Sequence, residues 1–290
     1  MRRGVDGFGE MSSRQSFSLG KALSAAVTGV PAAWGGAGLS LCLLLAAFAA
    51  WPLAFAHLSC CVALAGGIVV LWLLKLMALG GLYRTHIFGR TAGAEGRGPG
   101  GLQFGAVEVR LLFSTLVIAL FVAMVAVAGF FVFAIAFDLS GLARGYSNSY
   151  AGWHAAVMRH HSVTDWVFTV LPLVMVLFFV FVSLKVVLAP VATVAERRMV
   201  TLNAMGLSAG NVGKLFLGTV VLAVPFVVAG AVVMHHLPHH HAMKTSAVSP
   251  LHAHLVMHMV MAALSVGLLL PLQTGFLASA YRQIVDLRAK

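Results

Sequence analysis

Charged residues are scarce in this chain of 290 residues, where Asp, Glu, Lys and Arg together make up 9%. A soluble protein carries about 25% of these four residues. Hydrophobic residues make up 60% of the chain, and a water-soluble domain of this length could not bury that much apolar surface. The composition therefore excludes a soluble protein and predicts one membrane-embedded unit.

Cysteine is also rare, because the chain holds only Cys42, Cys60 and Cys61. Two of them are neighbours and the third lies within an apolar run, so they do not form a disulfide framework. Recognisable motifs that would join a nucleophile to a base are missing as well. These absences favour a non-enzymatic protein without structural disulfides.

Long apolar runs, in contrast, are abundant. A helix needs about 20 mostly apolar residues to cross roughly 30 Å of hydrocarbon, and six segments meet this requirement. They lie at about 38–56, 58–83, 111–137, 167–190, 215–234 and 251–281. The alternation typical of a membrane barrel is absent. The sequence therefore predicts an all-α polytopic membrane protein with six transmembrane helices in one domain, residues 38–281.

Basic residues gather on one side of these six spans. Fourteen of the 19 Lys and Arg residues fall in the two tails or in the loops after the second and fourth spans. Because loops rich in Lys and Arg stay in the cytoplasm, we predict that residues 1–37 and 282–290 are cytoplasmic tails. The predicted location is the bacterial inner membrane. The fourteen residues are Arg2, Arg3, Arg14, Lys21, Arg84, Arg90, Arg97, Arg110, Arg197, Arg198, Lys214, Arg282, Arg288 and Lys290.

The net charge of +11 follows from the same distribution. Basic loops beside a membrane attract anionic phospholipid head groups. The lipid bilayer and these head groups are therefore the predicted partners, and no nucleic acid is needed to explain the charge.

Three units of similar design follow one another along the chain. Each has a short amphipathic stretch on the cytoplasmic surface, then an outward span, then an inward span. The surface stretches lie at about 19–33, 102–110 and 200–214, and we expect interfacial helices there. This order favours a threefold parallel hairpin repeat, although apolar helices also resemble one another by composition alone.

Three motifs near the cytoplasmic ends of the spans resemble those of a known group. They are Gly80-Gly81-Leu82-Tyr83-Arg84, then Gly98-Pro99-Gly100-Gly101-Leu102-Gln103-Phe104-Gly105 with Glu108 and Arg110, and then Leu188-Ala189-Pro190 followed by Glu196-Arg197 and the stretch 202–210. In these motifs the chain resembles uncharacterised six-span inner-membrane proteins of bacteria, which are similar to the membrane domain attached to some glycerophosphodiester phosphodiesterases. The resemblance implies the fold and the location. It implies no activity, because the catalytic part of those enzymes is a separate soluble domain for which this chain has no room.

Histidines gather on the side opposite to the basic residues, where twelve of the 13 are predicted to lie. Imidazole is a common ligand of zinc and copper, and the interleaved methionines add a preference for Cu(I). A periplasmic copper or zinc site is therefore one hypothesis. A tolerant loop that drifted to this composition and a pH-sensing surface are the alternatives. The candidate ligands are His235, His236, His239, His240, His241, His252, His254 and His258.

Two lysines, Lys75 and Lys185, are predicted to lie within the membrane. Charges at this depth are costly and often functional, so the two lysines could line a cytoplasm-facing cavity for an anionic ligand such as a lipid phosphate. Alternatively, their long side chains reach the head groups. Glu108 and Glu196 are expected to pair with these lysines or with the nearby arginines at 110 and 197.

These features lead to two hypotheses about function. The main one is a non-enzymatic integral inner-membrane protein that assists membrane organisation or acts as a scaffold for partner proteins. The alternative is the transport or handling of a small solute. That solute would be a transition metal at the histidine-rich face, or else an anionic lipid.

Overall fold

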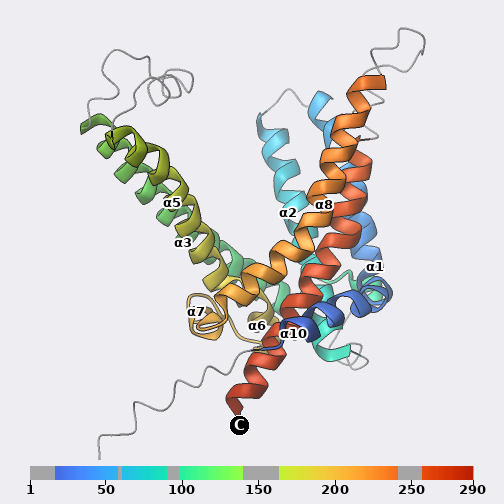
Figure 1. The fold of residues 1–290 in the computed structure, drawn as a ribbon. Helices are drawn as coiled ribbons and strands as arrows, with labels where there is room; N and C mark the ends of the chain where they lie inside the picture. The colour runs from blue at the N-terminus through green and yellow to red at the C-terminus, as the bar shows by residue number, and fades with distance from the viewer. Residues whose placement is uncertain (1–16, 58–60, 90–97, 140–162, 241–256, 290) are drawn as a thin grey trace, which may run out of the picture.

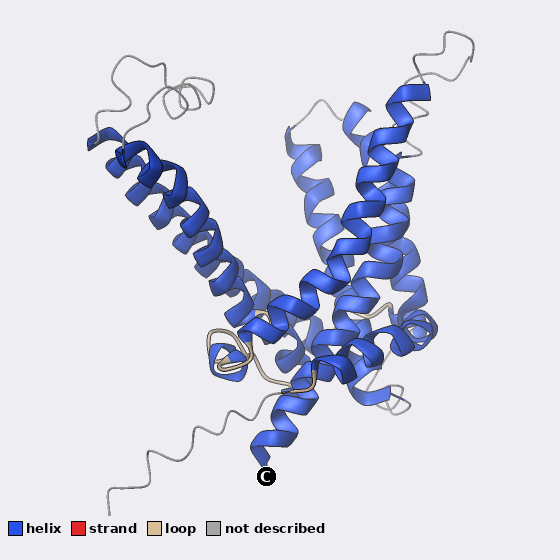
Figure 2. Cartoon of the chain, viewed as in Figure 1, coloured by secondary structure: helices blue, strands red, loops and turns tan. Residues whose placement is uncertain are grey.

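The computed structural model describes residues 17–57, 61–89, 98–139, 163–240 and 257–289. All regular secondary structure in these residues is helical, as Figure 2 shows. Six helices of the described chain are long and apolar enough to cross a membrane. The predicted all-α fold with six transmembrane helices is therefore confirmed. Its physical reason is that a helix satisfies its own backbone hydrogen-bonding groups in hydrocarbon.

Long helices form most of the structure, and short helices join them. The long helices are α1 (Leu19–His57), α2 (Cys61–Phe88), α3 (Ala106–Leu139), α5 (Val163–Val186), α8 (Val212–His240) and α10 (Leu270–Ala289). The short elements are η3 (Pro99–Gly101), α6 (Ala189–Glu196), α7 (Ala204–Ser208) and the π-helical turn η4 (Ala263–Leu269), which continues into α10. We call the end of the molecule at which α6, α7 and the C-terminal end of α10 lie the base (Figure 1).

Helix α1 is bent at Ala37, whose φ of −127° and ψ of 18° are not helical. Glycines surround this residue in the run Gly35-Gly36-Ala37-Gly38, and glycine weakens a helix. The first part of α1 crosses the base beside α10, and the second part rises away from it (Figure 1). The predicted surface stretch 19–33 and the predicted span from residue 38 thus lie on opposite sides of the bend.

The main hydrophobic core lies at the base, where the first part of α1 meets α6, α8 and α10. Phe17, Leu188 and Phe276 are fully buried there. The rings of Phe17 and Phe276 meet edge to face with their centroids 6.3 Å apart, which is a favourable aromatic geometry. Gly218 of α8 makes room for Phe276, because a Cβ at Gly218 would lie 2.1 Å from that ring.

A hydrogen bond from α1 compensates for a proline in the last span. Pro271 has no N–H, so the carbonyl of Gly267, four residues earlier, lacks its usual α-helical donor. The indole N–H of Trp34 donates to this carbonyl at 3.0 Å. The contact satisfies a backbone group inside the membrane domain and also fixes the first part of α1 against the last span.

Helices α3 and α5 form a hairpin that leans away from the other long helices (Figure 1), and we call it the α3–α5 hairpin. Its buried side chains are at the base, among them Leu111 and Ser114 of α3 and Leu184 of α5. Beyond Ser114, no residue of α3 that the structure describes is buried. The main packing partners of α3 in the described chain are α5, α6 and α2, and of these only α5 accompanies it away from the base (Figure 1).

The structure differs from the sequence prediction in the extent of two surface stretches. Residues 102–105 form no helix, and α3 begins at Ala106, so the stretch 102–110 is not a separate interfacial helix. The stretch 200–214 contains the five-residue α7 before α8 begins at Val212. A further short helix, α6, follows α5 and ends the fourth candidate span, Val170–Glu196. It carries Pro190 in its first turn, where the missing N–H of proline costs no helical hydrogen bond.

Candidate functional site

A glycine-rich run at residues 98–105, which we call the glycine segment, packs against the bend in α1. Gly100 and Gly101 have φ values of 60° and 78°, a backbone conformation that glycine adopts without steric cost. A Cβ at Gly101 would lie 2.8 Å from the Cα of Ala37, and one at Gly100 would lie 2.4 Å from the Cβ of Leu39. Glycine is therefore required twice over, by conformation and by space.

A buried ion pair between Arg84 of α2 and Glu108 of α3 lies beside the glycine segment. The two side chains are 4% and 1% exposed. Glu108 also accepts the N–H of Gly105 at 2.9 Å, which is half of a capping box at the start of α3. Arg84 also donates to the side chain of Gln103 at 3.1 Å. Gly80 leaves room for the carboxylate, because a Cβ there would lie 2.7 Å from Oε1 of Glu108.

The prediction that Glu108 pairs with Lys75, Lys185 or Arg110 is wrong. Arg110 stands only two residues from Glu108 on the same helix, and side chains at that spacing point to different sides. The partner of Glu108 is Arg84, which comes from the preceding span. The pair thus links α2 to α3 across the glycine segment, a connection that no spacing along α3 would indicate.

Three of the arginines that indicated the orientation bind backbone carbonyls at or near the ends of helices. The last carbonyls of a helix have no partner within it, and a cation is favourable beside them. The arginines therefore help to hold the base together. The contacts are Arg282 with the carbonyls of His86 and Ile87, Arg288 with that of Gly206, and Arg110 with that of Arg197.

Hydroxyl groups fix the loop that follows α6 against the start of α3. The Ser114 hydroxyl donates to the carbonyl of Val200 at 2.6 Å. The N–H of Val200 donates to the Thr193 hydroxyl at 3.1 Å, and all three residues are buried. Since buried polar groups are costly unless paired, this network holds the loop in one position.

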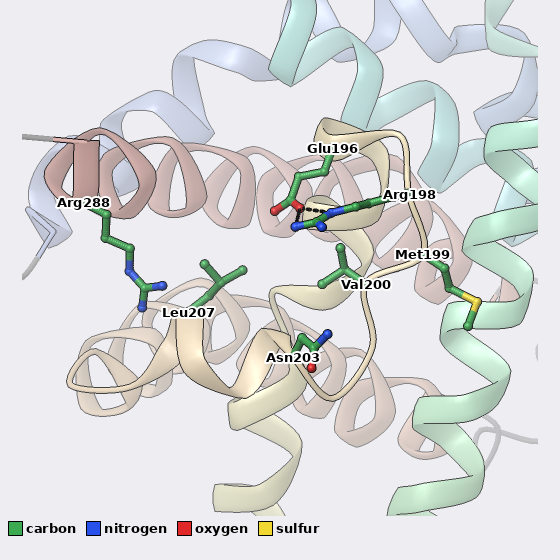
Figure 3. Close-up of a pocket in the computed structure, with 7 residues that line it drawn as sticks. All are labelled: Glu196, Arg198, Met199, Val200, Asn203, Leu207 and Arg288. Atoms are coloured by element: carbon green, nitrogen blue, oxygen red, sulfur yellow. Dashed lines mark hydrogen bonds and ion pairs between the residues drawn. The ribbon is translucent and has the colours of Figure 1, made fainter.

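A pocket of about 150 Å³ is present at the base, where α6 and its following loop meet α7 and the end of α10 (Figure 3). Figure 3 shows Arg288 on one side and Glu196 with Arg198 on the other, while Leu207 and Val200 lie between them. The pocket therefore combines two guanidinium groups with an apolar floor. The full lining is Glu196, Arg198, Met199, Val200, Asn203, Leu207 and Arg288.

Glu196 orients Arg198 at the edge of this pocket. Nε of Arg198 donates to one carboxylate oxygen at 2.7 Å, and the Tyr281 hydroxyl donates to the other at 3.0 Å. The expected pairing of Glu196 with Arg197 is wrong. Arg197 ends α6 in a left-handed conformation with φ of 53°, which turns its guanidinium toward the ring of Phe88, 5.9 Å from the centroid.

The two membrane lysines of the sequence prediction do not meet at this pocket, and neither of them lines it. Lys75 is exposed on α2. Lys185 is half-buried near the end of α5, with Nζ 5.3 Å from the centroid of the Phe181 ring. This geometry is that of a cation–π contact. Lys185 also supplies its carbonyl to the Ser208 hydroxyl of α7 at 2.7 Å.

Most of the candidate metal ligands lie outside the described part of the chain. His241, His252 and His254 are not described, and of the histidines in the last part of α8, from 235 to 240, only the helical backbone is. His258 is exposed on the helical stretch that begins at residue 257. The described residues contain no group of three or more His, Cys, Asp or Glu side chains placed to hold a metal ion.

The pocket was not predicted from the sequence, although parts of it lie in predicted motifs. Glu196 and the stretch 202–210 belong to one motif, and Arg288 is one of the basic residues of the predicted C-terminal tail. The two arginines of the pocket stand 90 positions apart, at 198 and 288. The sequence predicts only that the loop containing Arg198 and the tail containing Arg288 lie on the same side of the membrane. That prediction is too general to place the two side chains in one pocket.

The helices and their composition define the class of this molecule as an all-α, multi-pass membrane protein. Comparison with models of protein families, with curated proteins and with solved structures gives no match to this chain. The resemblance to the membrane domain of glycerophosphodiester phosphodiesterases therefore stays a prediction from the motifs.

Proposed function

We propose that this protein is a non-enzymatic scaffold of the bacterial inner membrane, with both termini in the cytoplasm, that binds a transmembrane helix of a partner protein. The observation that supports the proposal is the α3–α5 hairpin. Its two helices pack against the other described elements at the base, whereas beyond Ser114 no described residue of α3 is buried. A hairpin in this position offers a long lateral surface to other membrane helices.

The outer face of α3 combines large apolar side chains with a small residue. Gly129 faces α5, because a Cβ there would lie 2.7 Å from Cε of Met175. Leu120, Met124 and Val127 lie on another face and are 66%, 64% and 53% exposed. The exposed Ala123 stands among them, and small residues let a neighbouring helix approach closely in a membrane. The matching partner is an apolar transmembrane helix.

Contacts at the base fix the position of α3 and therefore of its outer face. The Arg84–Glu108 pair ties the start of α3 to α2, and the Ser114–Val200 hydrogen bond ties α3 to the loop after α6. Buried and fully paired polar groups of this kind favour a single arrangement. The hairpin therefore presents its outer face in a defined direction, as a scaffold requires.

The test is site-specific photo-crosslinking in native membranes, with the photoreactive residue at Leu120 or Met124 and, as a control, at Met175, which faces α3. We expect one discrete protein adduct from the two outer positions and none from the control position. Ala123→Trp should abolish the adduct, because the indole fills the packing surface. Val227→Trp on α8, where the side chain is 68% exposed, should leave the adduct unchanged.

The outcomes of this experiment separate three cases. A defined adduct of another protein that is lost in the Ala123→Trp variant supports the scaffold. An adduct of twice the chain's mass would show that the face pairs two copies, which would replace the proposed partner. Lipid adducts alone, at both outer positions, would refute the proposal.

Metal handling is the second candidate function, favoured by the outward histidines of the sequence. A deletion strain would be grown in excess and in depleted copper or zinc. It would then be complemented with the native gene or with a variant in which the histidines from His235 to His241 are replaced by Ser. A metal-dependent growth defect that the variant fails to rescue supports this function, and unchanged growth in every condition rejects it.

A further inference from the structure

The pocket at the base has the properties of an anion site beside a membrane. Two guanidinium groups reach it from distant parts of the chain, Arg198 from the loop after α6 and Arg288 from the end of α10. One carboxylate, that of Glu196, also lines it, so the charged side chains of the lining carry one net positive charge. Arginine presents several N–H donors in a planar fork that matches the oxygens of a phosphate group.

Each arginine is already directed by one partner. Arg198 contacts the carboxylate of Glu196 through Nε at 2.7 Å and through a terminal nitrogen at 2.6 Å, and Arg288 donates to the carbonyl of Gly206. A guanidinium has five N–H donors, so these contacts orient the two groups and leave other donors for a ligand. The amide of Asn203 adds a third polar group to the lining. Such prior orientation lowers the entropy that binding would otherwise cost.

The size of the pocket and its apolar floor narrow the class of ligand. A volume of about 150 Å³ is well above what a single water molecule needs, so the pocket has room for a group of the size of a phosphate. Leu207 and Val200 form an apolar surface beside the arginines (Figure 3). A phosphate that carries apolar groups would use both parts of the lining.

The position of the pocket in the fold points to the membrane surface. Its lining comes from the loop and the short helix that connect the fourth and fifth spans, and from the end of the sixth span. Such connections lie where spanning helices leave the hydrocarbon, at the level of the phospholipid phosphates. The neighbouring Lys214 and Arg197 add positive charge around the same end of the molecule.

We propose that this pocket binds a phosphate group, supplied either by an anionic phospholipid head group or by a free phosphate anion. The chemistry is common to both sources, and the apolar floor favours the lipid. The proposal is independent of the scaffold function, because it concerns the base and not the α3–α5 hairpin.

The test uses native mass spectrometry of the full chain in detergent, titrated separately with phosphatidylglycerol, phosphatidylcholine and inorganic phosphate. We expect saturable binding of one phosphatidylglycerol and much weaker binding of phosphatidylcholine, whose head group has no net charge. Arg288→Gln should weaken phosphatidylglycerol binding about tenfold, since a lost charge-assisted hydrogen bond commonly has an effect of this size. Lys21→Gln is the matched control, because it removes one exposed positive charge from the first part of α1, outside the pocket.

A second variant separates binding from folding. Leu207→Trp fills the floor of the pocket without changing any charge, and it should also weaken binding while the protein elutes as the native species in size-exclusion chromatography. If inorganic phosphate binds and displaces the lipid, the free anion is the source and the site is still supported. Equal losses in the Arg288→Gln and Lys21→Gln variants would reduce the effect to general charge attraction and overturn the proposal. Equal binding of the two lipids would also overturn it.

Discussion

Replacing Arg84 by methionine is the sharpest test of how the base is held together. The substitution keeps a long unbranched side chain but removes the guanidinium that pairs with Glu108. The carboxylate would stay in a site where its side chain is 1% exposed, and of the hydrogen bonds described above only that from the N–H of Gly105 would remain. A buried charge left in this way is strongly destabilising, because neither water nor an opposite charge compensates for the lost hydration.

The size of the effect follows from the burial of the pair. Removing one partner of a buried ion pair typically costs about 3–5 kcal/mol. Exposed pairs contribute about 0–1 kcal/mol, because water and salt screen them. Arg198, whose side chain is 76% exposed in its pair with Glu196, is therefore the matched control. We expect Arg84→Met to lower the free energy of unfolding by about 3 kcal/mol or more, and Arg198→Met by less than about 1 kcal/mol.

A double variant shows whether the loss comes from the ion pair itself. In Arg84→Met/Glu108→Leu no unpaired charge remains, so the double variant should be more stable than the sum of the two single losses implies. The assay is equilibrium unfolding of the purified protein in mixed micelles, followed by tryptophan fluorescence. Strictly additive losses, or a loss in Arg84→Met no larger than in Arg198→Met, would refute the assignment of a buried ion pair at this position.

Three further predictions concern the backbone and the orientation. Gly101→Ala should lower the thermal stability more than Gly89→Ala. Both have positive φ values of 78° and 54°, but only at Gly101 is the space for a Cβ occupied, and the left-handed conformation alone costs about 1–2 kcal/mol. Trp34→Phe should cost about 1–3 kcal/mol, because the carbonyl of Gly267 loses its donor. The loss should shrink in a Pro271→Ala background, where a backbone N–H returns, and an equal loss in both backgrounds would argue against this account. A periplasm-dependent reporter enzyme fused to the C-terminus should be inactive, since the basic residues predict a cytoplasmic C-terminus, and an active fusion would reverse the proposed orientation.

Local composition was sufficient to predict the spans, because each span is recognisable from its own length and hydrophobicity. The prediction of α6 and α7 was less complete. The predicted fourth span ends at residue 190, which is a proline, but a proline also starts a helix well, and here it lies in the first turn of α6. Similarly, the amphipathic pattern of 102–110 predicted a separate helix, whereas the chain forms a turn and the start of α3. Residues at helix ends satisfy several patterns at once, and tertiary contacts decide among them.

The candidate site was harder to predict for a related reason. Glu108 was expected to pair with Lys75, Lys185 or Arg110, yet its partner is Arg84 of the preceding span. A carboxylate attracts any nearby cation, so charge alone leaves many partners open. The space that Gly80 leaves beside the carboxylate selects one of them. That space exists only once α2 and α3 have packed.

The number of membrane crossings and the all-helical architecture were determined by sequence alone. In hydrocarbon, both depend on the transfer of short continuous segments and on backbone groups that must be paired within each segment. Only the tertiary structure decided that α3 and α5 lean away from the other helices, and that Arg198 and Arg288 line one pocket. Such features arise from contacts between residues that are distant along the chain, and apolar helices carry little pattern to specify which of their faces will meet.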